Sequence, residues 1–592
     1  MITIRRRAFR GLAILGFFGL VMPTWAQTPV GSPEKALQQK RELIQKAYTL
    51  VDEIAIGAHG LKLPENRSFV LTSAADLLWR HDEKRARALF WDSLNSINLL
   101  VGPGGNSPKP IAKKNQEKHY FAIYTLRQGL LRTVAKHDPQ LALDMLRSTR
   151  QMPVEQANAN YRLPDDSDLE QQIATEAAAR DPQRGLELAR ESLAKGFTFQ
   201  LLELLDRLNQ RDQEVGTKFA GDMIDKLQTR NLASDIFASR IAVDLVVWSR
   251  KQIGSDPEKV SAPYKINQLK LETERRRQLV EMIANAAMSV SANSTLLNSV
   301  NEIMTEIQEF VPERVALLQK KVSAFEQTLN KEQRSWNDYN SLVRAGSPED
   351  MIAASLKADS HQRQMLRQQA IVIAIFRRRA EALREFIKNE VEDDSLQRSL
   401  MDDLDTEQIT AATVGGDADE LRTLLPRVRR KEERARAMTE LAVVLEKKGD
   451  HDEAVKLLDE ARTMIKVDFE SETQSNALMA LVAAYAVVEP PKAFAIIERT
   501  IDRANDQISK ALLLDKIVRS GVIKNGEVLM QNSAIISPEY VMFRYGKAVA
   551  TLATADFNRT RAAADRFERM ELRLMMRLLL AQSLLEDGRR TK

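Results

Sequence analysis

One short pattern recurs along the chain where one predicted helix ends and the next begins. An aspartate preceded by His, Arg or Gly is followed, four positions later, by a small or modest side chain. The pattern occurs at residues 81–86, 137–142, 180–185, 416–421 and 449–454. An aspartate at the N-cap accepts hydrogen bonds from free backbone N–H groups, and Pro139 and Pro182 suit the first helical position, where no N–H is needed. A small residue one turn later lets two helices pack closely. The repetition therefore predicts stacked helical hairpins.

The segments between these junctions have the composition of helices. The 592 residues include only 23 glycines and 19 prolines, which gather between segments rich in Ala, Leu, Arg, Glu and Gln. Strand-like alternation is nearly absent, so we predict an all-α chain. Residues 521–530 are the exception, because Asn525-Gly526 could turn a small β-hairpin. We expect a bent helix-loop-helix connection there instead.

Residues 437–464 are similar to a known repeat. The small and apolar positions of a tetratricopeptide repeat are matched in type and spacing by Leu441, Ala442, Gly449, Ala454 and Ala461. A second Gly-Asp pair lies 33 residues upstream, at Gly416, which is close to that family's repeat length. The N-terminal junctions are spaced 56 and 43 residues apart, so the repeats there are irregular. The chain thus resembles the tetratricopeptide-repeat family, and this resemblance implies an irregular α-solenoid.

The same resemblance implies binding and no catalysis. Arrays of this family bind proteins or peptides on a concave surface, through exposed residues of the first helix of each pair. In the best-matched repeat those positions fall among Arg436, Thr439, Glu440, Val443 and Glu446.

The middle of the chain has a different spacing. From Leu318 to Val343 the apolar residues mostly alternate steps of four and three, which predicts one long helix from Pro312 to about Gly346. Packed against residues 265–310, it would form a long helical hairpin over 265–346. That hairpin is either a protruding coiled coil or two ordinary solenoid helices. It separates an irregular helical-repeat region at 27–264 from a tetratricopeptide-like region at 347–592.

The first 26 residues predict export. Four arginines, ending at Arg10, precede 12 apolar residues from Gly11 to Met22, and Ala26 offers a small residue for cleavage. Twelve residues are too few to span a bilayer core of roughly 30 Å, so we expect a cleaved signal peptide and no stable membrane span afterwards. Without a cysteine after this segment the protein is not a lipoprotein. We predict a periplasmic or extracellular location. The general secretory and twin-arginine routes both stay open.

Removing this segment changes the charge balance. The whole chain carries a formal charge of +5, and loss of four arginines with no acidic residue leaves +1. A nearly neutral chain is not expected to bind nucleic acid through its phosphates. We interpret the basic runs at 275–277, 377–379 and 429–431 as solvated helix faces. The absence of cysteine excludes disulfides, thiolate catalysis and zinc-thiolate sites.

No pattern of residues predicts a catalytic, metal or cofactor site. The six histidines form neither HExxH nor a His-x-His pair, and His81, His137 and His451 stand at helix junctions, where a turn or capping role is expected. The paired carboxylates at 165–166, 393–394 and 402–403 fall at predicted caps and helix ends. Three loops, at 102–110, 163–168 and 254–263, could carry binding residues.

These observations favour an exported helical-repeat scaffold that binds a protein or peptide partner in the cell envelope, without a cofactor. Two alternatives stay open. One is an enzyme, either active on the cell wall or built as a helical toroid. The other is a structural envelope spacer, which would use the predicted long hairpin.

Overall fold

The computed structural model describes residues 33–101, 113–149, 165–250, 269–330 except 292–293 and 295, positions 334, 338–339 and 342–343, and then 346–465, 472–518, 523–530 and 538–590. The predicted signal peptide lies outside the described residues. The predicted loops at 102–110 and 254–263 also lie outside them.

Nearly every described residue is helical, which confirms the predicted all-α class. The first half contains α1 (Pro33–Ala58), α2 (Pro64–Leu78), α3 (Glu83–Val101), α4 (Lys113–Ala135), α5 (Pro139–Ser148), α6 (Asp166–Ala178), α7 (Pro182–Lys195), α8 (Gln200–Arg211), α9 (Gln213–Gln228), α10 (Ile236–Trp248), α11 (Thr273–Ser289), α12 (Leu296–Asn301), α13 (Met304–Phe310), the 3₁₀ turn η4 (Pro312–Arg314) and α14 (Val315–Thr328).

The second half continues in the same way. It contains α16 (Pro348–Lys357), α17 (Ser360–Phe376), α18 (Ala380–Glu390), α19 (Asp394–Gly415), α20 (Ala418–Leu424), the 3₁₀ turn η5 (Leu425–Arg427), α21 (Lys431–Lys448), α22 (His451–Met464), α23 (Glu472–Val488), α24 (Pro490–Val518), β1 (Ile523–Lys524), β2 (Glu527–Val528), α25 (Pro538–Ala555), α26 (Phe557–Asp565) and α27 (Met570–Arg590).

The predicted aspartate caps are present at four of the five junctions. The Asp138 carboxylate accepts from the Leu141 N–H at 2.9 Å, and Asp82, Asp181 and Asp417 accept from backbone N–H groups in the same way. Asp450 is the exception and caps nothing with its side chain. The prediction was wrong there, although this junction lies in the best-matched repeat. The chain still turns as expected, because Gly449 is left-handed at φ +86° and ends α21.

The small residues one turn after each cap do bring helices close together. A Cβ placed on Gly185 would lie 2.5 Å from the Cβ of Ala178 and 2.6 Å from its Cα. Helices α6 and α7 could not approach so closely with a larger side chain there. Gly216, four residues after the capping Asp212, also permits a close approach, because a Cβ there would lie 2.6 Å from the Cα of Asn209. The sequence analysis missed this sixth junction, although Arg211 precedes Asp212 just as Arg180 precedes Asp181.

The predicted long helix in the middle of the chain is wrong. Residues 273–328 form short helices, and α14 ends at Thr328, after which Leu329 is extended at ψ 136°. The apolar spacing was read correctly, since Leu318, Val322 and Phe325 are buried. They belong to the apolar core of the first half of the chain, where α14 contacts the helices α11, α12 and α13. The envelope-spacer alternative therefore loses the long hairpin that supported it.

Residues 523–528 form the hairpin that the sequence analysis placed second. Ile523 pairs with Val528 and Lys524 with Glu527, and Asn525-Gly526 makes the turn with positive φ at both positions. The expected helix-loop-helix connection was wrong. Tertiary contacts stabilise this short hairpin, because Glu527 and Val528 form hydrogen bonds with residues at the start of α2, as described below.

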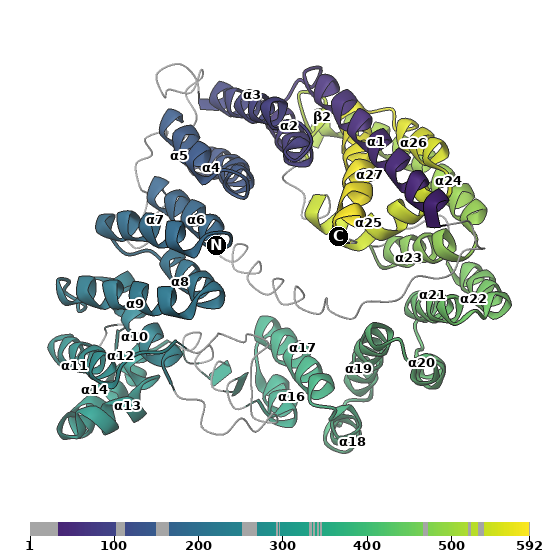
Figure 1. Cartoon of the computed structure of the whole chain (residues 1–592). Helices are drawn as coiled ribbons and strands as arrows, with labels where there is room; N and C mark the ends of the chain where they lie inside the picture. Colours follow the sequence, from purple (N-terminus) through teal and green to yellow (C-terminus); the bar gives the residue numbers. More distant parts are fainter. Residues whose placement is uncertain are drawn as a thin grey trace.

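The helix pairs stack into a closed ring (Figure 1). Helices α2, α4, α6 and α8 contact one another in series along the inside, and α17, α19, α21, α23, α25 and α27 do the same in the second half. The two series join because α27 packs on α25 and also on α2. The predicted solenoid is thus confirmed, and its two ends meet.

The join is a helix pair made from both ends of the chain. Helix α1 packs on α27, as the two helices of an ordinary pair do. Glu53 of α1 accepts from Arg561 of α26 at 2.8 Å, and Asp52 of α1 pairs with Arg85 of α3 at 2.9 Å. Helix α1 therefore takes the outer position between α26 and α3. We call the contacts of α1 and α2 with β2, α26 and α27 the seam.

Three apolar cores hold the ring together. The first runs from Ala47 to Leu329 and also includes residues of 530–585, so the two ends share one core across the seam. The second core covers 351–404 and the third covers 409–552. Helix α19 serves both of these, with Leu404 in one and Ile409 in the other. The predicted division at 264 and 346 stays a prediction.

Candidate binding surface on the inner face of the ring

The predicted binding positions lie on α21, one of the inner helices. The structure brings Arg436 and Glu440 together at 3.0 Å, and Arg436 also pairs with Glu433 at 3.2 Å. Thr439 is 2% exposed, and its hydroxyl donates to the Arg436 carbonyl, so it cannot reach a partner. Arg436, Glu440, Val443 and Glu446 are half-buried, and their contact with a partner stays a prediction.

Polar side chains of α19 face α21 at this place. The Thr413 hydroxyl donates to Glu440 at 2.6 Å, and Arg436 donates to the Thr410 hydroxyl at 3.3 Å. Arg430, just before α21, lies 3.6 Å from carboxylate oxygens of both Asp402 and Asp403. Helix α17 adds Arg367, whose Nε donates to Ser355 at 3.2 Å. We call these groups of α17, α19 and α21, together with Glu407, the inner patch.

Desolvation dominates the electrostatics of the inner patch. Burial raises the pKa of Glu440, and the attraction of Arg436 and the bond from Thr413 only partly oppose it. Burial raises the pKa of Asp403 and of Glu407 as well. Glu407 is open to solvent, so this rise reflects the protein mass around it, as expected on a concave surface. Burial and the neighbouring Arg363 lower the pKa of Arg367. The neighbouring groups therefore do not fully compensate the free-energy cost of desolvating these charges.

This arrangement predicts a pH dependence of stability. Because the folded pKa of Glu440 is raised above its usual 4.5, the folded state binds that proton more tightly than the unfolded state. Stability then falls as pH rises through the interval between the two pKa values. Glu440→Gln keeps an acceptor for Thr413 and removes the desolvated charge. We expect it to raise Tm by about 1–2 °C near pH 7 and to have no such effect below pH 4.5, in thermal melts across this range. The matched control is Glu453→Gln on the outer helix α22. An equal gain in both variants would contradict the explanation by burial.

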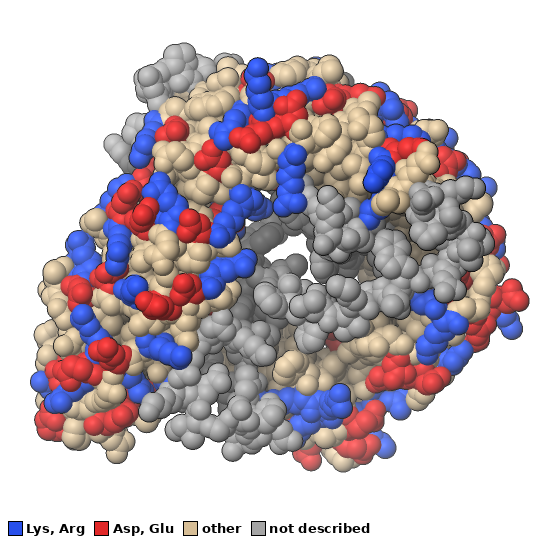
Figure 2. All heavy atoms as spheres, in the orientation of Figure 1, with Lys and Arg blue, Asp and Glu red and all other residues tan. Residues whose placement is uncertain are grey.

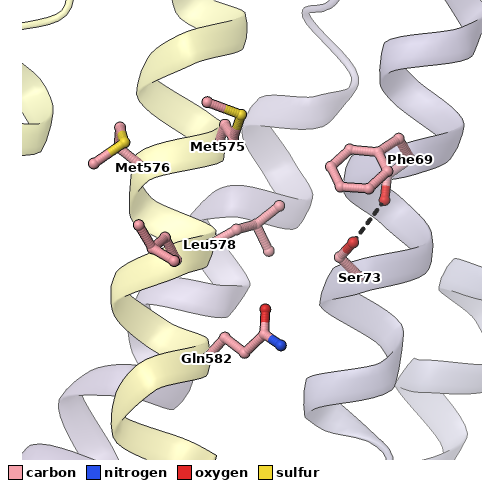
Figure 3. A pocket seen from close by; sticks show the side chains of 7 residues that line it. Phe69, Ser73, Met575, Met576, Leu578 and Gln582 are labelled. Carbon is pink, nitrogen blue, oxygen red and sulfur yellow. Dashed lines mark hydrogen bonds between the residues drawn. The ribbon is translucent and has the colours of Figure 1, made fainter. Parts of the chain in front are cut away.

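A second feature of the inner layer is an apolar groove at the seam (Figure 3). Phe69 and Ser73 of α2 face α27 across it. The α27 side is formed by Met575, Met576, Leu578, Leu579 and Gln582. Sequence analysis missed this groove, because its two walls lie about 500 positions apart in the chain.

The remaining sequence candidates have structural roles. His137 lies 2.6 Å from Asp76 and stacks on Trp79 with ring centroids 4.8 Å apart. His451 contacts Glu446 at 2.9 Å, so the predicted binding residue Glu446 already has a partner. Asp165 and Asp393 cap α6 and α19. Among the described positions, no group of three or more His, Asp or Glu side chains is placed to hold a metal ion.

The charged surface has no continuous area of one sign on the face shown in Figure 2. Basic and acidic side chains are mixed over the described part of that face, and basic ones border the central opening at its upper left. The basic run at 275–277 is ion-paired, with Arg276 3.2 Å from Glu306 and Arg277 2.9 Å from Glu281. None of the helices within the described ranges is both long enough and apolar enough to cross a membrane.

Comparisons with known proteins give little. No protein-family model and no curated protein matches this chain. One similar solved structure is a circular tandem repeat protein with novel repeat topology and enhanced subunit contact surfaces, 13% identical, with a TM-score of 0.14 over 93% of this chain and 99% of that one. Another is the APC/C hetero-tetramer Cut9-Hcn1, 14% identical, with a TM-score of 0.18 over 93% and 96%. At such TM-scores neither likeness bears on fold or function, which rest on the contacts of the chain itself.

Proposed function

We propose that this protein is an exported scaffold that binds a protein or peptide partner on the inner face of its ring, at the inner patch. The observation that carries the proposal is the cluster of acidic and basic side chains there, with Arg430 3.6 Å from Asp402 and Asp403 and Arg436 3.0 Å from Glu440. Asp403, Glu407 and Glu440 have raised pKa values, and Arg367 has a lowered one. Ionisable groups with shifted pKa values are typical of functional sites, where a bound ligand can pair with the charges.

The chemistry of the patch indicates the kind of partner. Acidic and basic groups alternate across three neighbouring inner helices, and among the described residues no carboxylate forms an ion pair with Arg367. A segment with charges of both signs could pair with Arg367 and with Glu407 at once. Desolvated pairs of this kind contribute to specificity as well as affinity. Export rests on residues 1–26 and is part of the proposal.

Site-specific photocrosslinking tests the binding face. A photoreactive amino acid at Glu407 is expected to form discrete adducts in cells that export the full chain. The matched control position is Lys456, which is exposed on the outer helix α22. Arg367→Glu should reduce the adduct at position 407 about tenfold, which corresponds to ~1.4 kcal/mol of binding free energy. Identical adducts at both positions, or none at position 407, would refute the inner-face proposal. Cell fractionation of the same strains tests export separately.

A further inference from the structure

Helix α1 packs on a surface that α26 and α27, near the other end of the chain, form. Its buried residues, such as Ile54, share the first core with Leu574 of α27. The fit is close, because a Cβ on Gly57 would lie 2.9 Å from a methyl group of Leu574. A Cβ on Gly60 would lie 2.9 Å from the terminal methyl of Met570. Side chains of α27 thus lie directly against the two glycines at the end of α1 and in the turn after it.

Among the described residues, the hydrogen bonds of the seam join positions much farther apart in the sequence than the bonds between other helix pairs do. The bond between Glu53 and Arg561 joins residues 508 positions apart, and those between α2 and Glu527 span 461 to 465. Elsewhere in the outer layer, Asp225 and Arg275 are only 50 apart. Because loop-closure entropy grows with the length closed, the seam is expected to form after the local pairs. Until then the apolar faces of α1 and α27 are exposed to solvent.

The connection from α1 to α2 is short and open. His59, Gly60 and Lys62 are exposed. The backbone N–H groups of His59, Gly60 and Leu61 reach only three residues back, as from Gly60 to the Gly57 carbonyl at 3.0 Å. The next two N–H groups, of Lys62 and Leu63, donate to Glu527 instead. A change of backbone angles at His59 and Gly60 alone would release α1 while the start of α2 keeps its bonds to Glu527.

We propose that α1 is an exchangeable closing helix, which docks on α26 and α27 of a second copy of this chain when chains fold at high concentration. The product is a domain-swapped dimer in which each ring is closed by the other copy's α1, with the same seam contacts. We infer that the helix bound at this surface is α1 of the second copy, because the contacts there are made by residues of α1: Gly57 lies against Leu574, and Glu53 pairs with Arg561. This inference does not depend on the proposed function.

A chain without cysteine allows a direct test. The full chain carrying Glu53→Cys and Arg561→Cys is unfolded, refolded at about 0.1 µM or about 50 µM, and treated with a short bismaleimide. We expect an intrachain link after dilute refolding. After concentrated refolding, the covalent dimer should increase more than about fivefold. Light scattering of the unsubstituted chain, refolded in the same way, should show the same dimer.

The matched control carries Asp225→Cys and Arg275→Cys, an outer-layer ion pair between neighbouring helices α9 and α11. It is expected to link within one chain at both concentrations, because these helices close locally. Two results would overturn the proposal. One is an intrachain link at the seam at both concentrations. The other is a covalent dimer that forms equally with the control pair, which would indicate unspecific association.

Discussion

Replacing Glu527 with alanine is expected to lower the free energy of unfolding by about 3–5 kcal/mol and to open the ring at the seam. The Glu527 side chain is buried, and its carboxylate accepts from the N–H groups of Lys62 at 2.6 Å and Leu63 at 3.0 Å. It also accepts from Asn66 Nδ2 at 3.3 Å. Helix α2 has no cap of its own at Leu63, so Glu527 supplies one from the other end of the chain. Without it, these buried donors lose their acceptor.

Denaturant unfolding and small-angle scattering would measure the two effects. The variant should show a lower midpoint and a larger radius of gyration than the unsubstituted chain. Glu453→Ala is the matched control, because Glu453 pairs with Arg422 at 3.1 Å between two outer helices while both side chains stay exposed. An exposed pair of this kind contributes about 1 kcal/mol or less. Equal losses in both variants, or an unchanged radius for Glu527→Ala, would show that this carboxylate does not hold the seam.

Replacing Gly185 with leucine is expected to destabilise the N-terminal repeats by about 3–5 kcal/mol. The new Cβ would lie 2.6 Å from the Cα and 2.9 Å from the backbone nitrogen of Ala178. Backbone cannot move aside as a flexible side chain can, so α6 and α7 must separate. Gly185→Ala should already cause most of this loss, because the Cβ itself makes the clash.

Gly129 in α4 provides the control. A Cβ there would meet nothing within 4 Å, so Gly129→Ala is expected to stabilise the helix by about 0.5–1 kcal/mol. Circular dichroism with chemical denaturation would compare the four chains. If Gly185→Ala were as harmless as Gly129→Ala, the close packing of α6 on α7 would not be what the glycine provides.

The helices and their junctions could be predicted because their determinants are local. Asp138 caps a helix through N–H groups within three residues, and Gly185 lies one turn from Asp181. Asp450 shows the limit of such rules, since its residue type and position fit while its side chain caps nothing. The hairpin at Asn525-Gly526 has a strong local signal, and it was ranked second because the surrounding helices dominated the pattern.

The candidate site was predicted only in part. The resemblance named Arg436 and Glu440, which lie in the inner patch, and their contact with a partner stays a prediction. The hydrogen bonds of Glu440 could not be predicted, because its partner Thr413 lies on a different helix, α19. Arg367, on α17, could not be connected with them from spacing alone. Residues on three helices become neighbours only when the pairs have stacked.

The sequence alone determines an all-helical chain of capped, closely packed pairs, since each cap and each small residue acts within about six positions. It does not determine that the ends meet. Whether a solenoid stays open or closes depends on the small rotation between successive pairs, summed over the whole array. Only the folded arrangement of the pairs brings α1 beside α27 and Glu527 to the start of α2. The same closure turns the concave side of the solenoid into the enclosed inner face on which the proposed function rests.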